Sequence, residues 1–483
     1  MRLFLLAASS LALFDSLGRH VLRNWDEAIY GEIAKEMLTR HTWLTPTFDF
    51  RPWLEKPPAF MWITALSFRL FGISEISFRA FGALCAVATV WLTFEIGRRL
   101  VDDWGGFFAA IVLLTNGYFL YIGRFGSTDM PLTCCLALVA YGYLRVRQGN
   151  PRWWYAVAAA MGIAIMIKGA AAADAPLALC LALAIDRRLH QLRSRQLLRP
   201  ALLACAIVLP WHLAMLVQHG RVFLNQYIGY QVVTRATSQI EGHAEPAYFY
   251  LLEYWNFFLL FALLALVGLF LHLKGQRNSS IVVSFALVVT VAFSLAGTKL
   301  YTYVVPAFPF IALLAMLAVR RLLTSAPYIL MSAAILFPLY WFFQTTESPN
   351  PFQVNYSASY IPPGPIASRN DPLMRLLMQA NASAASQAPT PLIVCFNDLL
   401  IEKQQLLFYS GRPVVETFFG AAPDDSRESP YWNPMPLAMA VGPGSYPVIL
   451  PVGAYRELAF SGRYTLQFVA QDGPLILGQI ARQ

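Results

Sequence analysis

Two aspartates lie where a carboxylate could act on a hydroxyl group. Asp26 and Asp129 each lie in a short polar segment next to a long apolar run. An ionised carboxylate can accept a proton from a hydroxyl group or orient that group for attack. Each aspartate also has a structural explanation, because a carboxylate in the first turn of a helix interacts favourably with the helix dipole. Spacing alone leaves both explanations open.

Basic residues occupy similar positions at the ends of apolar runs, among them Lys56, Arg235 and Lys299. Lys56 follows Glu55 and precedes two prolines, which fix the backbone at that point. Clustered cations beside a bilayer suit a lipid phosphate or pyrophosphate. The alternative is that each long side chain only extends its charge toward the membrane interface.

Glu55 has two further explanations. It could pair with Lys56, or it could hold a divalent ion, and oxygen ligands near it would favour a hard cation. His243 lies alone in a later loop, where a histidine is more often solvated than bound to a metal. A divalent cation could therefore bind, but the sequence assigns no metal.

The segment after the first apolar run predicts an amphipathic helix on the membrane surface. An apolar residue recurs every fourth position, at Ile29, Ile33 and Met37. We expect Glu32, Lys35 and Glu36 on the opposite, exposed face. Asn24 and Glu27 have the spacing of a capping box, which gives Glu27 a structural role.

The composition indicates an integral membrane protein. The chain has 483 residues, of which 57% are hydrophobic and 13% are charged. A soluble protein carries about 25% charged residues, so much of this surface must face lipid. The net charge of +9 comes from short loops between apolar runs. The positive charge therefore reflects the membrane topology, and we expect no nucleic acid partner.

About eleven apolar stretches, from residues 2–17 to residues 327–343, each have roughly the length of one bilayer span. Every even-numbered loop between them contains at least two basic residues, which predicts that these loops are cytoplasmic. The odd-numbered loops, which contain the candidate residues, and the tail then face the other side. The long loop of residues 18–77 is one of them.

The tail from residue 344 alternates apolar and polar runs, for example at residues 391–396 and 446–452. This pattern predicts a small α/β domain. The expected architecture is therefore a mainly α, polytopic transmembrane helical bundle of residues 1–343 and a soluble, non-cytoplasmic α/β domain of residues 344–483.

Short motifs follow one another in a characteristic order between Asn24 and Phe310. They are Trp25-Asp26-Glu27 with Tyr30, Glu55-Lys56-Pro57-Pro58, Phe71-Gly72 with Arg79, Gly123-Arg124-Phe125 with Thr128-Asp129-Met130-Pro131, Lys168-Gly169, Arg235 with His243, Pro246 and Tyr248, and Gly297-Thr298-Lys299-Leu300 with Tyr303, Pro306 and Pro309. In this order, and with this topology, they resemble the glycosyltransferase C superfamily. The resemblance is strongest to bacterial lipid A aminoarabinose transferases and protein O-mannosyltransferase-like enzymes.

The resemblance implies roles for these residues. Asp26 and Asp129 correspond to functional aspartates and are expected to be catalytic. Lys56, Arg235 and Lys299 are expected to contact the phosphate of the donor. The residues implied as metal ligands or supports are Glu55, Glu27, Tyr30 and His243. Gln231 stands about where the aminoarabinose transferases place a histidine linked to metal, so the particular metal and sugar are not implied.

The function expected from this resemblance is an inverting transfer of a sugar from a polyprenyl-phosphate carrier to an envelope lipid, glycan or protein. The site would face the periplasm from a bacterial inner membrane. The alternative is a lipid-linked-glycan flippase or transporter. Coupled transport usually leaves ionisable residues near the bilayer midplane. Here Asp15, Glu95 and Asp174 lie near the ends of apolar runs.

The predicted topology can be tested at the C-terminus. A compartment-specific reporter fused after Gln483 should be active only on the non-cytoplasmic side, because about eleven spans separate the two ends of the bundle. A cytoplasmic signal would reverse the orientation and move the candidate residues to the wrong face.

Overall fold

The computed structural model describes residues 1–15, 17–23, 25–239, 245–273, 279–322, 371–383, 391–395, 403–410, 412–418 and 435–482. These residues are mainly helical, as predicted, and divide into two compact units. The helical unit comprises Met1–Leu17, Leu54–Ile63 and Arg79–Ser357, and the sheet unit comprises Gly18–Trp53, Thr64–Phe78 and Ala358–Gln483. The domain boundary predicted at residues 343 and 344 and the last predicted span, residues 327–343, lie outside the described residues.

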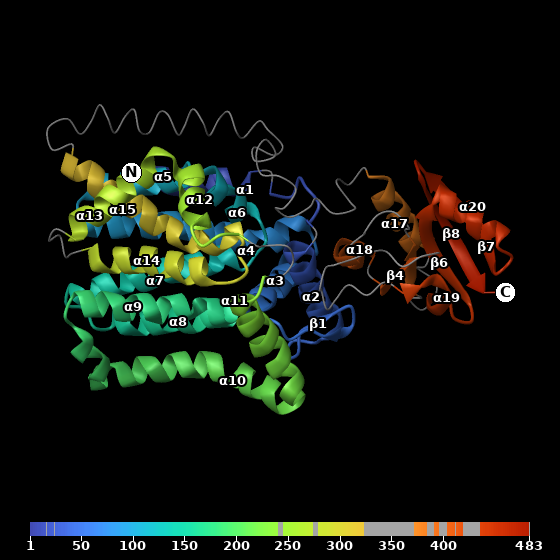
Figure 1. Ribbon diagram of the computed structural model, residues 1–483, viewed down its shortest axis with the longest axis horizontal. Coiled ribbons are helices and arrows are strands. Elements are labelled where there is room, and N and C mark those ends of the chain that lie inside the picture. Colours follow the sequence, from blue (N-terminus) through green and yellow to red (C-terminus); the bar gives the residue numbers. More distant parts are fainter. Residues whose placement is uncertain are drawn as a thin grey trace. The chain divides into compact units, whose positions relative to one another are not determined.

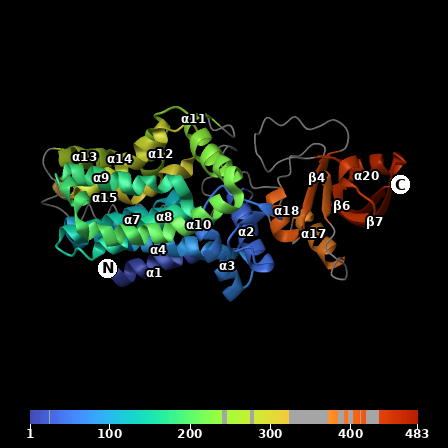
Figure 2. The same cartoon turned by 90° about the horizontal axis from the view of Figure 1, so that it is seen from below.

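The helical unit consists of apolar helices that run side by side. Its α-helices are α1 (Arg2–Phe14), α4 (Glu75–Leu100, which begins in the sheet unit), α5 (Asp103–Leu114), α6 (Gly117–Arg124), α7 (Asp129–Arg147), α8 (Trp153–Lys168), α9 (Asp174–Ile185), α10 (Leu198–Phe223), α11 (Arg235–Thr237), α12 (Phe249–Phe258), α13 (Leu260–Leu273), α14 (Ser280–Leu295) and α15 (Phe308–Leu322). The 3₁₀ segments are η1 (Gly169–Ala173), η2 (Leu189–Arg193), η3 (Arg195–Leu197) and η6 (Tyr301–Ala307), and η4 (Leu224–Thr234) is a π-helix. Helices α7 and α8 pack together, as do α9 and α14 (Figures 1 and 2).

Four helical stretches of the described chain are long and apolar enough to cross a membrane: Glu75–Leu100, Trp153–Ile185, Arg195–Thr237 and Tyr301–Arg321. The number rises to six if each of two bent helix pairs is one span. Shorter apolar helices are α1, α3 (Ala59–Phe71) and α14. Helix α3 lies within residues 18–77, for which the sequence predicts a long loop. The total of about eleven spans stays a prediction.

Two stretches predicted as single spans are bent. Helices α5 and α6 meet at 69°, and the break between α12 and the helical residues Phe261–Leu273 is 115°. At the first break, the Asn116 side chain accepts a hydrogen bond of 2.8 Å from the Phe119 N–H and so starts a new helix. At the second, Leu259 has φ 47°. Hydropathy detects the apolar run but not these local changes of direction.

Helix α10 has the surface expected where a helix faces lipid. Its apolar side chains are largely exposed, with Val217 84% and Leu213 53% accessible. One side packs on α8. Gly220, at φ 49°, interrupts the helix shortly before the π-helical segment η4 begins.

The sheet unit is built on a six-stranded sheet with strand order β5-β4-β3-β6-β8-β7. The strands are β3 (Leu392–Cys395), β4 (Val414–Phe418), β5 (Met435–Pro436), β6 (Ser445–Pro451), β7 (Tyr464–Asp472) and β8 (Leu475–Arg482). Strands β3 to β6 are parallel where they pair, whereas β8 pairs antiparallel with both β6 and β7. The predicted strand runs at residues 391–396 and 446–452 thus coincide with β3 and β6, and the α/β prediction is confirmed for the described tail.

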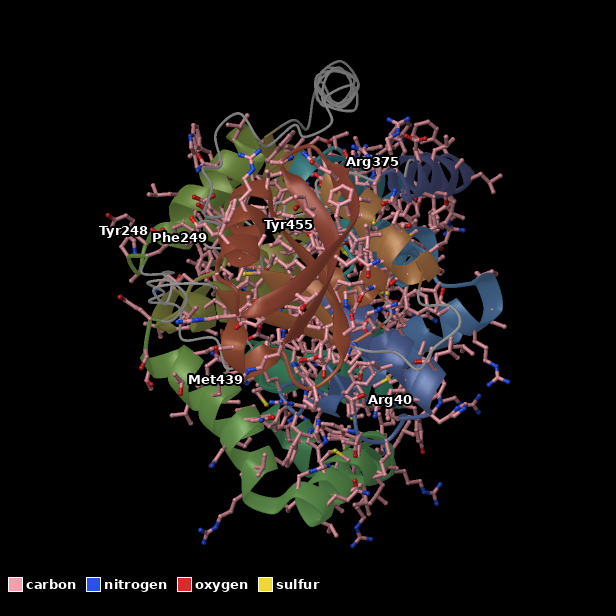
Figure 3. The ribbon with its side chains drawn as sticks, turned by 90° about the vertical axis from the view of Figure 1, so that its right-hand side faces the viewer. Arg40, Tyr248, Phe249, Arg375, Met439 and Tyr455 are labelled. Carbon is pink, nitrogen blue, oxygen red and sulfur yellow. The ribbon has the colours of Figure 1, made fainter. Side chains whose placement is uncertain are left out.

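Helices accompany this sheet, and one is fixed to it by an ion pair. They are α17 (Pro372–Ser383), α18 (Lys403–Ser410), α19 (Leu437–Ala440) and α20 (Val452–Phe460). Arg375 of α17, which is labelled in Figure 3, pairs with Asp472 at the end of β7, with 2.7 Å between Nη2 and Oδ1. Leu458, Val448 and Ile480 belong to the buried core between α20 and the sheet.

Helix α2 (Asp26–Arg40), the short hairpin of β1 (Thr47–Phe48) and β2 (Arg51–Pro52), and part of α3 also belong to the sheet unit. The prediction that Glu32 and Glu36 lie on an exposed face is wrong, because their exposed fractions are 3% and 2%. Glu32 pairs with Lys35 at 3.1 Å. Glu36 accepts hydrogen bonds from the Thr47 hydroxyl and, at 3.1 Å, from the Phe50 N–H. Protein partners, rather than water, therefore surround these carboxylates.

The buried Glu32 should make stability depend on pH. Burial raises the pKa of Glu32 to about 7, with Lys35 opposing the shift and Glu36 and Asp49 adding to it. The native state therefore holds a proton that the unfolded state releases, and stability falls as pH rises from about 4.5 to about 7. We expect Glu32→Gln to raise the melting temperature at about pH 8 and to change it much less at about pH 5.

The control for Glu32→Gln is the same substitution at a glutamate that is not buried. Glu457 on α20 is exposed, so Glu457→Gln should change the melting temperature little and equally at both pH values. An equal effect of Glu32→Gln at the two pH values would show that the Glu32 carboxylate titrates as in the unfolded chain.

Candidate functional site

A buried ion pair joins the start of α7 to the end of α8. Asp129, the first residue of α7, is 2% exposed, and its Oδ1 accepts a hydrogen bond of 2.5 Å from Lys168 Nζ. The Ser127 hydroxyl donates to the other oxygen, Oδ2, at 3.0 Å. Lys168 ends α8, and the next residue, Gly169, has φ 59°. The two helix ends thus hold both oxygens of Asp129 in a fixed geometry.

Tyr303 connects this ion pair to Arg235. Lys168 Nζ lies 5.2 Å from the centre of the Tyr303 ring, a cation–π distance. The Tyr303 hydroxyl accepts a hydrogen bond of 3.1 Å from Arg235 Nη1. Tyr303 appeared in the sequence only as part of a motif and was given no role. Its position between two cations could not be read from local spacing.

Backbone hydrogen bonds bring the segments of Arg235 and Lys299 together. The Gly297 N–H donates to the Ala236 carbonyl at 2.9 Å, and the Thr298 N–H donates to the Arg235 carbonyl at 3.1 Å. A Cβ atom at Gly297 would lie 2.6 Å from the Ser238 carbonyl oxygen, so this close approach requires glycine. The backbone of Gly297 and Thr298 is therefore hydrogen-bonded to α11, and Lys299 follows directly.

Lys299 is nearly buried in this arrangement. It is 7% exposed, and its Nζ donates to the Ala296 carbonyl at 2.7 Å. The ammonium group has three donors, so one carbonyl contact leaves it capacity for further acceptors. Arg235 also lies over the Tyr230 ring, with 5.7 Å between the guanidinium carbon and the ring centre.

The segment Leu54–Lys56 is anchored on the same part of the helical unit. The Gln231 side-chain N–H donates to Glu55 Oε2, and Gln231 lies on η4, four residues before Arg235. Leu54 packs into a buried cluster with Met166, Trp211, Met215, Phe223 and Tyr227. Glu55 is 8% exposed, and Lys56 is partly exposed beside it. The prediction that this turn is rigid fits these contacts.

A divalent cation at Glu55 stays unassigned. The group that faces its carboxylate from η4 is an amide N–H of Gln231, which donates a hydrogen bond and cannot bind a cation. No group of three or more His, Cys, Asp or Glu residues that could hold a metal occurs in the described part of the chain. His243 lies outside the described residues.

Asp26 lies in the sheet unit, at the start of α2. Its Oδ1 accepts a hydrogen bond of 3.0 Å from the Tyr30 hydroxyl one turn later. The Tyr30 ring packs edge-on against Trp53, with 6.2 Å between ring centres. Asp26 itself is partly exposed. Tyr30 therefore fixes one oxygen of a carboxylate that solvent can still reach.

Glu27 has a structural explanation, although not the full predicted capping box. Helix α2 begins at Asp26 with Trp25 as its N-cap, and Asn24 lies outside the described residues. Glu27 is completely buried, and its Oε2 accepts a hydrogen bond of 2.8 Å from the Arg23 N–H. It thus satisfies a backbone donor before the helix, but this donor is Arg23 and not the N-cap residue, so the bond is not that of a capping box.

The predicted site residues consequently fall into two groups. Asp129, Arg235 and Lys299 lie in one cluster of the helical unit with Lys168 and Tyr303, and Glu55 joins that cluster through Gln231. The residues in the sheet unit are Asp26, Glu27 and Tyr30. The expected convergence of Asp26 with Asp129 stays a prediction.

Comparisons with known proteins agree with the resemblance seen in the sequence. Residues 55–213 match the family model of dolichyl-phosphate-mannose-protein mannosyltransferases. An uncharacterised protein of Aquifex aeolicus is 28% identical over 65% of this chain and 63% of its own length. The undecaprenyl phosphate-alpha-4-amino-4-deoxy-L-arabinose arabinosyl transferase 1 of Pseudomonas fluorescens is 32% identical over 60% of this chain and 52% of its own length. The chain thus spans between about half and two thirds of these curated relatives.

The fold is similar to that of a solved aminoarabinose transferase. ArnT from Cupriavidus metallidurans, determined with undecaprenyl phosphate bound, superimposes with a TM-score of 0.73 over 99% of this chain and 97% of that protein, at 20% sequence identity. The predicted resemblance is confirmed. The chain shares the fold of this solved protein and resembles the aminoarabinose transferases in sequence.

Proposed function

We propose that this protein transfers a sugar from undecaprenyl phosphate, or a similar polyprenyl phosphate, to an acceptor at the periplasmic face of a bacterial inner membrane. The observation that carries the proposal is the backbone pairing of Gly297 and Thr298 with α11. This pairing fixes the segments of Arg235 and Lys299 beside Tyr303 and the Asp129–Lys168 ion pair.

The chemistry of this cluster supports a phosphate leaving group. Lys168 is engaged by Asp129 at 2.5 Å, Arg235 donates to the Tyr303 hydroxyl and lies over the Tyr230 ring, and Lys299 donates to the Ala296 carbonyl. Cations in an apolar setting interact strongly with an anion. We assign the donor phosphate to Arg235 and Lys299, with Lys56 as the third contact.

In the proposed reaction, the bond between the anomeric carbon and the phosphate oxygen breaks, and its electron pair leaves with the lipid phosphate. An acceptor oxygen forms the new bond to the anomeric carbon from the opposite side, with inversion. Arg235, Lys299 and Lys56 stabilise the charge that develops on the phosphate. Asp129, fixed by Lys168 and Ser127, assists by orienting the reacting groups.

Asp26 is assigned to the acceptor. Its carboxylate accepts a hydrogen bond from Tyr30 and is partly exposed, so it can orient an acceptor hydroxyl and take its proton. If the acceptor is itself a phosphate, little deprotonation is needed and Asp26 acts by positioning alone. The proposed acceptor is an envelope lipid, a glycan or a protein.

The flippase or transporter alternative has less support. Glu95, near the end of α4, pairs with Arg98 at 3.0 Å and with Arg2 at 3.2 Å, and so belongs to a cluster of ion pairs at this helix end rather than to a relay. The proposed topology has about eleven spans, with the site and residues 344–483 on the periplasmic side.

The role of Lys56 can be measured in steady-state kinetics. Lys56→Ala should weaken the use of the donor by about ten- to a thousand-fold, the range for loss of a charge-assisted contact, while the acceptor KM stays nearly constant. Lys56→Arg should recover part of the loss, because a planar guanidinium presents its donors differently.

The control for Lys56 is a cation at the other end of the bundle. Arg152 is exposed at the start of α8, whereas Lys168 ends that helix, so Arg152→Ala should leave the dependence on donor concentration unchanged. If Lys56→Ala also left the dependence on donor concentration unchanged, Lys56 would not contact the phosphate, and Arg235 and Lys299 would be its remaining contacts.

Asp26→Asn should abolish transfer in a protein that still inserts and folds. The asparagine side chain still accepts the Tyr30 hydrogen bond but cannot take a proton. If Asp26 only stabilised the helix dipole, its loss would cost about 0.3–1 kcal/mol and leave turnover nearly intact. Asp103 is the matched control, because it is also the first residue of a helix, α5, and is exposed. Full turnover of purified Asp26→Asn would contradict the catalytic role.

A further inference from the structure

Two side chains of α18, Gln405 and Tyr409, hold the backbone that leads into Asp26. Gln405 is completely buried, and its Nε2 donates to the Leu22 carbonyl at 2.6 Å. The Tyr409 hydroxyl accepts from the Leu22 N–H at 2.8 Å and donates to Glu75 Oε1 at 3.0 Å. The N–H and the carbonyl of Leu22 are thus both bound by one helix, 383 and 387 residues away in the sequence.

Leu22 is close enough to Asp26 for this contact to matter. The Arg23 N–H binds Glu27 and the Arg23 carbonyl accepts from the Ala28 N–H at 3.1 Å, so the chain turns directly from Leu22 into α2. Trp25 makes the turn with φ 62°, a conformation that is strained for a residue other than glycine. A backbone in this state persists only where its surroundings fix it.

Helix α18 is in turn fixed on the middle of α2. Lys35 Nζ donates to the Phe408 carbonyl at 2.6 Å and to the Leu407 carbonyl at 3.2 Å, in the last turn of α18. A cation is favourable there because the carbonyls at a helix end lack intrahelical partners. The Phe408 ring lies against Gly31, where a Cβ atom would be 3.2 Å from it. Figures 1 and 2 show α18 beside α2.

We propose that Gln405 and Tyr409 are positioning residues for the transfer reaction, which act by holding Asp26 through Leu22. The inference rests on the proposed function, because it concerns the role of Asp26. The tail thereby supplies part of the catalytic geometry, although neither side chain touches the reacting groups. Displacement of a reacting group by about 1 Å costs on the order of a hundred-fold in rate.

The test uses the full-length protein and two conservative variants. Tyr409→Phe removes one hydroxyl, and Gln405→Met removes the amide while keeping the length of the side chain. Each should lower kcat by about ten- to a hundred-fold, with the donor KM changed by less than about two-fold, because the phosphate contacts lie in the helical unit. Hydrogen exchange of the amides of residues 22–29 should become faster in both variants.

Matched substitutions elsewhere in the sheet unit provide the controls. Tyr446 donates to the Pro443 carbonyl at 3.2 Å, and Gln471 donates to the Gly473 carbonyl at 3.2 Å, both at exposed sites. Tyr446→Phe and Gln471→Met should keep both kcat and the exchange of residues 22–29 at wild-type values. They remove the same chemical groups without releasing Leu22.

The outcomes separate this inference from the proposed function. A wild-type protein without transfer activity would contradict the proposed function itself. With an active wild type, unchanged kcat in Tyr409→Phe and Gln405→Met would overturn the inference, as would a loss confined to the donor KM or equal to that of the controls. A fall in kcat with unchanged exchange of residues 22–29 would overturn it too, because Leu22 would then not be the link.

Discussion

The ion pair between Asp129 and Lys168 is the interaction on which the arrangement of the helical unit's charged residues depends. It lies among apolar helices, where an uncompensated charge is costly, and the loss of either partner would cost about 3–5 kcal/mol. Because Asp129 starts α7 and Lys168 ends α8, the pair also fixes two helix ends to each other. Lys168 lies over the Tyr303 ring, and the Tyr303 hydroxyl accepts a hydrogen bond from Arg235. The positions of the more distant cations therefore depend on this ion pair.

Much of the fold could be predicted because it depends on local patterns. Long apolar runs became helices, and the alternating runs around Ile393 and Val448 became strands of one sheet. The bend at Asn116 could not be predicted in the same way, because one side chain that caps a new helix does not alter the hydropathy of the run. The apolar helix α3 was missed for a related reason, since it is short and follows two prolines in a segment with many polar residues.

The candidate site was predictable only in part. Asp129, Arg235 and Lys299 were found because charges at the ends of apolar runs stand out from their surroundings. Tyr303 and Gln231 were not assigned, because a tyrosine or a glutamine at a span end is unremarkable until its partner is known. Their partners, Arg235 and Glu55, are 68 and 176 residues away in the sequence. Such contacts depend on the fold and leave no local signal.

Helix α2 shows where periodicity is ambiguous. Its apolar stripe is compatible with a lipid surface or with a protein surface, and the choice depends on the polar face. Glu32 and Glu36 are buried, and a buried carboxylate requires hydrogen-bond or ionic partners. Lys35 and the hairpin residues Thr47 and Phe50 supply them, and Lys35 binds the end of α18 at the same time. The first loop and part of the tail therefore complete one compact unit, although more than three hundred residues separate them in the sequence.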